Sequence, residues 1–190
     1  LDRIAKSVAG VHPKRKIPNF APQTFKQWFA GRGPRNQDRP RVILWADTFN
    51  NYFHPRTAQA AVDVLEAAGF RVAVPKMNLC CGRPLYDWGM LDEAKGALRQ
   101  ILDALKGPIE AGAPVVVLEP SCASVFRDEL TNFFPNDEDA KRLSEQTFLL
   151  SEFLQKKAPH FKPPRLKRKA VAHGHCHHKS LMKMDDEEAV

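Results

Sequence analysis

The sequence lacks any apolar run of the roughly 18 or more residues that a membrane-spanning helix needs. It also does not open with the charged and apolar stretches of a secretory signal peptide. Neither Gly-x-Gly-x-x-Gly nor the phosphate-binding pattern that ends in Gly-Lys-Ser or Gly-Lys-Thr occurs, which argues against a nucleotide site. These absences predict a soluble domain that binds something other than a nucleotide.

Cysteine is scarce: the 190 residues include only Cys80, Cys81, Cys122 and Cys176. In a small secreted protein, four cysteines would indicate two disulfides. A chain of this size with 43% hydrophobic residues can form a core without them. We therefore favour a cytoplasmic protein whose thiols bind a metal or a cluster, with peripheral association with a membrane left open.

Positive charge is concentrated at one end of the chain. Residues 1–41 hold ten Lys or Arg against two Asp or Glu, whereas the rest of the chain holds 19 against 20. This stretch is also rich in proline, which is typical of a linker. We expect a basic linker or arm over residues 1–40 and a folded domain over residues 41–190. Binding of nucleic acid by the arm is an alternative, but the body has no basic groove interleaved with aromatic residues, so we expect no nucleic-acid partner.

The body alternates short apolar runs with segments of helical periodicity. Strands are expected at 41–45, 70–74, 114–118 and 169–172, and helices at 55–68, 91–105, 123–134 and 140–156, with a short helix near 24–29 in the arm. This order predicts an α/β fold with a mainly parallel sheet flanked by helices, in Rossmann-like layers.

The residues with metal-ligand chemistry follow the expected strands. They are Asp47 after the first strand, Cys80 and Cys81 after the second, Glu119 and Cys122 after the third, and residues 173–178 after the fourth. The carboxyl ends of parallel strands lie at one edge of the sheet, where ligands bind. We therefore expect these side chains to form one site.

The stretch 79–84, Leu-Cys-Cys-Gly-Arg-Pro, is the centre of that site. Adjacent thiols cannot bond to each other without a strained ring, so they serve other partners. Gly82 lets the backbone approach a bulky ligand closely. The alternative is that one thiol is simply buried in the core, as free cysteine commonly is.

The stretch 173–178, His-Gly-His-Cys-His-His, has the donor types of zinc and iron sites. Its candidate ligands are Cys176, His173, His175 and His177. The alternative is a solvated turn whose charge changes with pH.

These motifs resemble the cysteine-rich CCG domain family, which includes the heterodisulfide reductase B subunit and the iron–sulfur subunits of systems that oxidise glycolate, lactate and glycerol 3-phosphate. The family repeat is Cys, a gap of thirty-odd residues, Cys-Cys-Gly, a similar gap and Cys-x-x-Cys. Here Asp47 stands at the first cysteine position and Glu119 at the penultimate one. The gaps are 32 residues (48–79) and 36 residues (83–118). Cys176 resembles the first cysteine of a second repeat, which would continue beyond Val190.

In detail, the chain looks most like the C-terminal iron–sulfur region of FAD-linked oxidases of the D-lactate dehydrogenase and glycolate oxidase type. The resemblance implies electron transfer from FAD on another domain of a longer parent chain, through a ferredoxin-like segment and an iron–sulfur cluster, to an acceptor. Oxidation of a 2-hydroxy acid is then assigned to the flavin domain, so the fragment alone should not turn over substrate.

The resemblance implies cofactor binding by Cys80, Cys81, Gly82, Cys122 and Cys176. Two carboxylates at thiolate positions make the first repeat a harder, more oxygen-rich site. Zinc in place of a cluster, or an empty site, therefore stays open. The alternative function is a structural zinc or thiol-redox module that docks flavin and partner domains.

Overall fold

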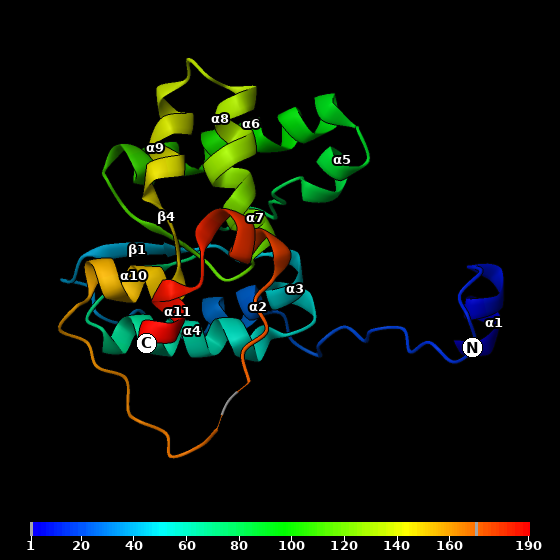
Figure 1. The fold of residues 1–190 in the computed structure, drawn as a ribbon, viewed down its shortest axis with the longest axis horizontal. Helices are drawn as coiled ribbons and strands as arrows, with labels where there is room; N and C mark the ends of the chain where they lie inside the picture. Colours follow the sequence, from blue (N-terminus) through cyan, green and yellow to red (C-terminus); the bar gives the residue numbers. More distant parts are fainter. Residues whose placement is uncertain (1, 170) are drawn as a thin grey trace.

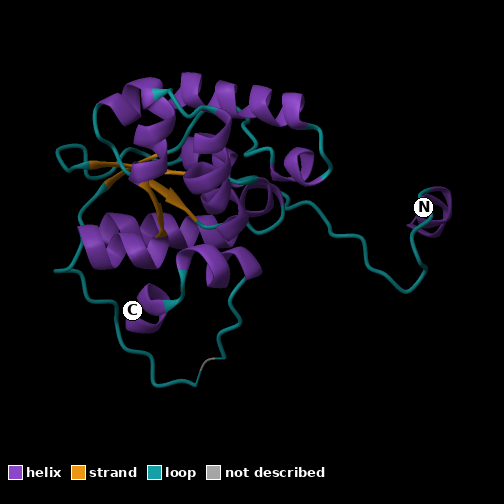
Figure 2. Ribbon diagram, turned by 45° about the horizontal axis from the view of Figure 1, so that its top comes forward, coloured by secondary structure: helices purple, strands orange, loops and turns teal. Residues whose placement is uncertain are grey.

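The computed structural model describes residues 2–169 and 171–190. Its centre is a four-stranded sheet in the order β2-β1-β3-β4, and all neighbouring strands are parallel. The strands are β1 (Arg41–Leu44), β2 (Arg71–Ala73), β3 (Val115–Val117) and β4 (Thr147–Leu149). Figure 2 shows the sheet between two layers of helices. The predicted α/β class with a parallel sheet is confirmed.

Helices cover both faces of the sheet, and its inner strands therefore carry apolar side chains on both faces. Successive side chains of a strand point to opposite faces, so Ile43 packs beneath α6 (Leu91–Glu110) while Val42 packs against α4 (Pro55–Ala67). A continuous apolar run is therefore what a strand of this sheet needs, and the sequence has one at β1 and at β3. Helix α4 connects β1 to its parallel neighbour β2, as expected for a βαβ unit.

The predicted fourth strand at 169–172 is wrong for its described residues, and residue 170 lies outside them. Lys169, Val171 and Ala172 are in a loop, and Val171 is fully exposed. The preceding residues 162–168 include four Lys or Arg, which do not suit a strand covered on both faces.

The fourth strand is instead β4, which lies inside the helix predicted for 140–156. That region forms α9 (Glu138–Gln146), then β4, then α10 (Leu150–Lys157). Thr147 and Leu149 are buried on β4, and the Arg127 guanidinium donates to the Thr147 carbonyl oxygen. The helical periodicity of the flanking segments hid a strand of three residues.

The other helical segments are short. They are α1 (Asp2–Val8), α3 (Thr48–Tyr52), α5 (Arg83–Asp87), α7 (Pro120–Ser124), the π-helical segment η1 (Val125–Glu129), α8 (Leu130–Phe133), the π-helical segment η2 (His178–Met182) and α11 (Asp185–Ala189). The helix expected at 123–134 corresponds to α7, η1 and α8 in succession. No helix within 2–169 or 171–190 is long and apolar enough to span a bilayer.

Part of the basic N-terminal region packs on the domain. Helix α2 (Phe25–Gly31) is where the sequence predicts a short helix, with Thr24 as its N-cap. Phe25 is fully buried in the cluster formed with α4, and Arg32 makes a two-point ion pair with Glu66 of that helix. Helix α1 stands apart from the rest of the molecule at the end of an extended stretch (Figure 1).

Replacing Phe25 by Ala should lower the free energy of unfolding by about 3–5 kcal/mol, because the substitution leaves a cavity in the core. The matched control is Phe20→Ala, at a side chain that is 72% exposed, and it should cost less than about 1 kcal/mol. Urea unfolding followed by circular dichroism measures both. Equal small losses would show that α2 is not part of the cooperative core.

Candidate functional site

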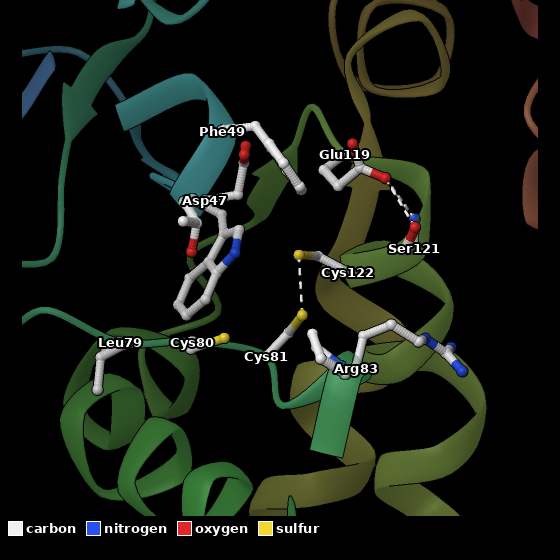
Figure 3. Close-up of a pocket in the computed structure, with 12 residues that line it drawn as sticks. Asp47, Phe49, Leu79, Cys80, Cys81, Arg83, Glu119, Ser121 and Cys122 are labelled. Carbon is white, nitrogen blue, oxygen red and sulfur yellow. Dashed lines mark hydrogen bonds between the residues drawn. The ribbon is translucent and has the colours of Figure 1, made fainter. Parts of the chain in front are cut away.

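The carboxyl ends of β1, β2 and β3 surround a cavity of about 170 Å³. Five of the predicted ligand residues line it: Asp47, Cys80, Cys81, Glu119 and Cys122. Figure 3 shows these five side chains around the cavity, together with Phe49 and Leu79 of its largely apolar wall. Three separate loops thus bring their ligand-type residues together, because the strands before them are parallel neighbours.

The Cys-Cys-Gly loop ends at the first turn of α5. Gly82 is the N-cap residue of that helix and has φ of +79°, a conformation that residues with a side chain rarely adopt. Cys80 is exposed and Cys81 is buried, so the two adjacent thiols have different access to solvent. Gly82 therefore acts on the site through the backbone, by turning the chain directly after the two thiols.

Cys81 and Cys122 are in contact across the cavity. Their Sγ atoms lie 3.0 Å apart, although Cys81 lies in a loop and Cys122 in helix α7, 41 positions later in the sequence (Figure 3). The hydrogen-bond contact between the two sulfurs, together with burial, raises the pKa of Cys81 to about 12. Hydrogen bonding to Cys81 and burial also raise the pKa of Cys80 well above its usual range. Near neutral pH both are therefore thiols, and a metal that binds them must displace the protons.

The two carboxylates of the cavity, Asp47 and Glu119, cap helices. Asp47 is buried and accepts hydrogen bonds from the backbone N–H of Asn50 at 2.9 Å and from its side-chain amide at 2.7 Å. Burial raises the pKa of the Asp47 carboxyl, and the hydrogen bonds from Asn50 oppose that shift. Glu119 accepts from the Ser121 N–H at 3.1 Å and from its hydroxyl at 2.7 Å. Each carboxylate therefore lines the cavity and also starts a helix, α3 or α7.

Trp45 is a cavity residue that the sequence reasoning used only as part of a strand. Its side chain is 1% exposed, and its ring packs edge-on against Phe126 with centroids 5.0 Å apart. The indole Nε1–H is buried without a hydrogen-bond partner within the described chain. Its position at the carboxyl end of β1, two residues before Asp47, was the available signal. An unused buried donor beside three thiols suits a ligand that carries acceptor atoms.

Arg83 is the second residue that the sequence reasoning missed. Its Nη2 lies 2.5 Å from Glu129 Oε1 and donates to the Ser124 hydroxyl at 2.7 Å, and Nη1 lies 3.3 Å from Asp87 Oδ1. Arg83 follows Cys81 by two positions, and Ser124 follows Cys122 by two. The guanidinium therefore ties the loop that carries Cys81 to the helix that carries Cys122. The Arg83–Glu129 contact is called the clamp below.

The predicted ligands do not converge on a single point. Within residues 2–169 and 171–190, no group of three or more His, Cys, Asp or Glu side chains is arranged to hold one metal ion. The three thiols instead line a volume, together with an unpartnered indole N–H. Cysteine sulfurs of this kind are ligands of iron–sulfur clusters and also of zinc.

The histidine-rich segment lies outside the cavity wall. His173, His175 and Cys176 are exposed and His177 is half-buried; the His175 and His177 rings stack with centroids 5.2 Å apart. The segment leads into η2, which packs against α7 (Figure 1). These residues do not line the cavity, and the strand expected before them does not form in the described residues.

Comparison with known proteins identifies the family of the cavity region. Residues 47–127 match the model of the cysteine-rich domain family CCG, a range that starts at Asp47 and includes all three cavity cysteines. The resemblance inferred from the Cys-Cys-Gly spacing is therefore confirmed. No solved structure matches the chain.

Three relatives illustrate the similarity. Lactate utilization protein A of Anoxybacillus flavithermus is 29% identical over 150 residues, which is 76% of this chain and 61% of that protein. A subunit of the anaerobic glycerol-3-phosphate dehydrogenase of Escherichia coli is 27% identical over 169 residues, 86% of this chain and 42% of that protein. Lactate utilization protein A of Geobacillus kaustophilus is 34% identical over 119 residues, 60% and 47% of the two chains. The chain thus spans about half the length of these relatives.

Breaking the clamp should be costly. Arg83→Met leaves the buried Glu129 carboxylate without its partner and should lower the free energy of unfolding by about 3–5 kcal/mol. The double variant Arg83→Met/Glu129→Leu removes both charges and should recover much of that loss. Arg99→Ala, which breaks the more exposed pair with Asp137, is the matched control and should cost less than about 1 kcal/mol. A double variant as unstable as the single one would contradict the assignment of Arg83 and Glu129 as a buried pair.

The raised pKa of Cys81 predicts slow alkylation. Because the thiolate is the nucleophile, its labelling by iodoacetamide should rise about tenfold per pH unit between about pH 8 and 10. The exposed Cys176 in the same sample is the internal reference and should be labelled first. Peptide mass spectrometry of a labelling time course measures both rates. Labelling of Cys81 as fast as that of Cys176 would contradict the proposed environment.

Proposed function

We propose, from the membership of residues 47–127 in the cysteine-rich CCG family, that this chain is an electron-transfer domain of an iron–sulfur oxidoreductase. The observation that carries the proposal is the presence of Cys80, Cys81 and Cys122 in the wall of one cavity. Sulfur ligands of this kind hold iron–sulfur clusters in proteins. The names of the relatives, which refer to lactate utilization and to a glycerol-3-phosphate dehydrogenase, support a redox role.

An iron–sulfur cluster bound here would supply one-electron transfer, with a potential that depends on its hydrogen bonds and its exposure. Cys80, Cys81 and Cys122 are the residues that would hold it. The indole N–H of Trp45 is an unused donor that would be available to a sulfur atom of the cluster. Asp47 and Glu119 are already occupied as helix caps, although each retains free acceptor capacity.

The proposed electron donor is an FAD domain of the same parent protein, through a ferredoxin-like segment. The proposed substrate is a 2-hydroxy acid such as lactate or glycolate, oxidised at the flavin and not in this cavity. Cys176 and the neighbouring histidines would then serve a second site, built with further chain. The described residues contain no other cavity lined by several thiols, so electrons would enter and leave this part of the protein at the Cys-Cys-Gly loop.

Anaerobic purification and reconstitution with iron and sulfide test the proposal. The chain should bind iron and sulfide in equal amounts and show broad visible absorption. Cys81→Ser and Cys122→Ser should each lower the affinity for iron by at least roughly 10–100-fold. That is the cost of removing the hydrogen-bond partner of a metal ligand, and these variants remove the ligand itself. Cys176→Ser is the matched control, outside the cavity, and should retain the iron.

Two outcomes would contradict the proposal. A colourless protein with one zinc ion would favour the structural zinc module instead. Iron that is retained by Cys81→Ser and Cys122→Ser but lost by Cys176→Ser would place the cofactor at the histidine-rich segment.

A further inference from the structure

The contact between Cys81 and Cys122 is close enough for a second chemistry. Their Sγ atoms are 3.0 Å apart, whereas the sulfurs of a disulfide lie about 2.05 Å apart. Closing the bond therefore needs a movement of about 1 Å, which is small for residues in a loop and in the first turn of a helix. Both residues are 6% exposed, so the pair is shielded from large reagents.

The clamp favours this pairing over the others. Arg83 contacts Ser124 and Glu129, so it holds the loop that carries Cys81 against the helix that carries Cys122. Cys80 is adjacent to Cys81 in the sequence, and a bond between neighbours would close a strained ring. Cys176 does not line the cavity. Among the four cysteines, Cys81 and Cys122 are the pair held in contact by surrounding structure.

We infer that Cys81 and Cys122 form a reversible disulfide when the cavity holds no metal centre, and that this bond blocks metal loading. The proposed oxidant is a small hydroperoxide, for which hydrogen peroxide is the probe. The second clause rests on the proposed function, because it requires that the same two sulfurs bind the metal centre. The first clause, that the disulfide forms, rests on the geometry of the pair alone.

The reaction balances as a two-electron oxidation. One of the two sulfurs attacks one peroxide oxygen as a thiolate, the O–O bond breaks, a sulfenic acid forms on that cysteine and one water leaves. The other sulfur then attacks the sulfenic acid sulfur, the S–O bond breaks, the S–S bond forms and a second water leaves. Hydrogen peroxide is reduced to two water molecules, and the two thiols lose two hydrogens. A small dithiol such as dithiothreitol reverses the reaction by thiol–disulfide exchange.

Peptide mapping of the metal-free chain tests the first clause. The protein is treated with hydrogen peroxide, free thiols are blocked after unfolding, and the digest is analysed with and without dithiothreitol. We expect one cross-linked peptide pair joining Cys81 to Cys122, about two mass units lighter than the two reduced peptides together. Cys80→Ser should keep this product, and Cys81→Ser or Cys122→Ser should lose it.

The identity of the product decides the outcome. A bond between Cys80 and Cys81, or cross-linked dimers through Cys80 or Cys176, would overturn the inference. Oxidation of Cys81 that stops at sulfinic acid with Cys122 still reduced would also overturn it. The mapping uses wild-type protein first, so the result does not depend on whether a serine variant folds.

The second clause has a separate readout. The oxidised chain should take up at least tenfold less iron during reconstitution than the reduced chain, and dithiothreitol should restore the uptake. If the disulfide forms but the reduced protein binds no iron, the proposed function fails and the disulfide stands. If iron binds equally before and after the disulfide forms, the blocking clause fails.

Discussion

The parallel direction of β1, β2 and β3 is the constraint on which the site depends. Each strand is covered on both faces, so the polar residues that follow it can only emerge at the carboxyl edge. Three loops that are far apart in the sequence therefore open into one cavity, which Asp47, Cys81 and Cys122 line together. The arrangement of the thiols around one cavity thus follows from the direction of the strands.

The two carboxylates of the cavity wall also hold its loops in place. Asp47 and Glu119 are both engaged with backbone N–H groups at the start of a helix. A carboxylate caps a helix better than a thiol does, because it is a stronger acceptor. Both side chains therefore stabilise the loops, while the soft donors of the cavity are Cys80, Cys81 and Cys122.

The fold class, the first three strands and the meeting of Asp47, Cys81 and Cys122 could be predicted from the sequence, because apolar runs and strand direction determine them. Strand β4 could not, since three residues between two amphipathic helices leave too short a pattern. The clamp was also hidden: Arg83 lies beside the motif, but its partner Glu129 is 46 positions away, and no local pattern connects them. The histidine-rich segment was expected at the end of a fourth strand at 169–172, and that strand does not form in the described residues, where a proline-containing basic stretch precedes it.

The π-helical segment η1 contacts two residues of the cavity wall, Trp45 and Arg83. A π turn holds an additional residue, so the helix from Pro120 to Phe133 changes phase within it. Phe126 thereby reaches Trp45 while Glu129 reaches Arg83, and the Arg127 carbonyl oxygen accepts from the Ser144 hydroxyl. Deleting one residue here would leave too few residues for the π turn and would change which side chains face Trp45 and Arg83. The length of this segment, independently of its composition, is therefore part of what specifies the site.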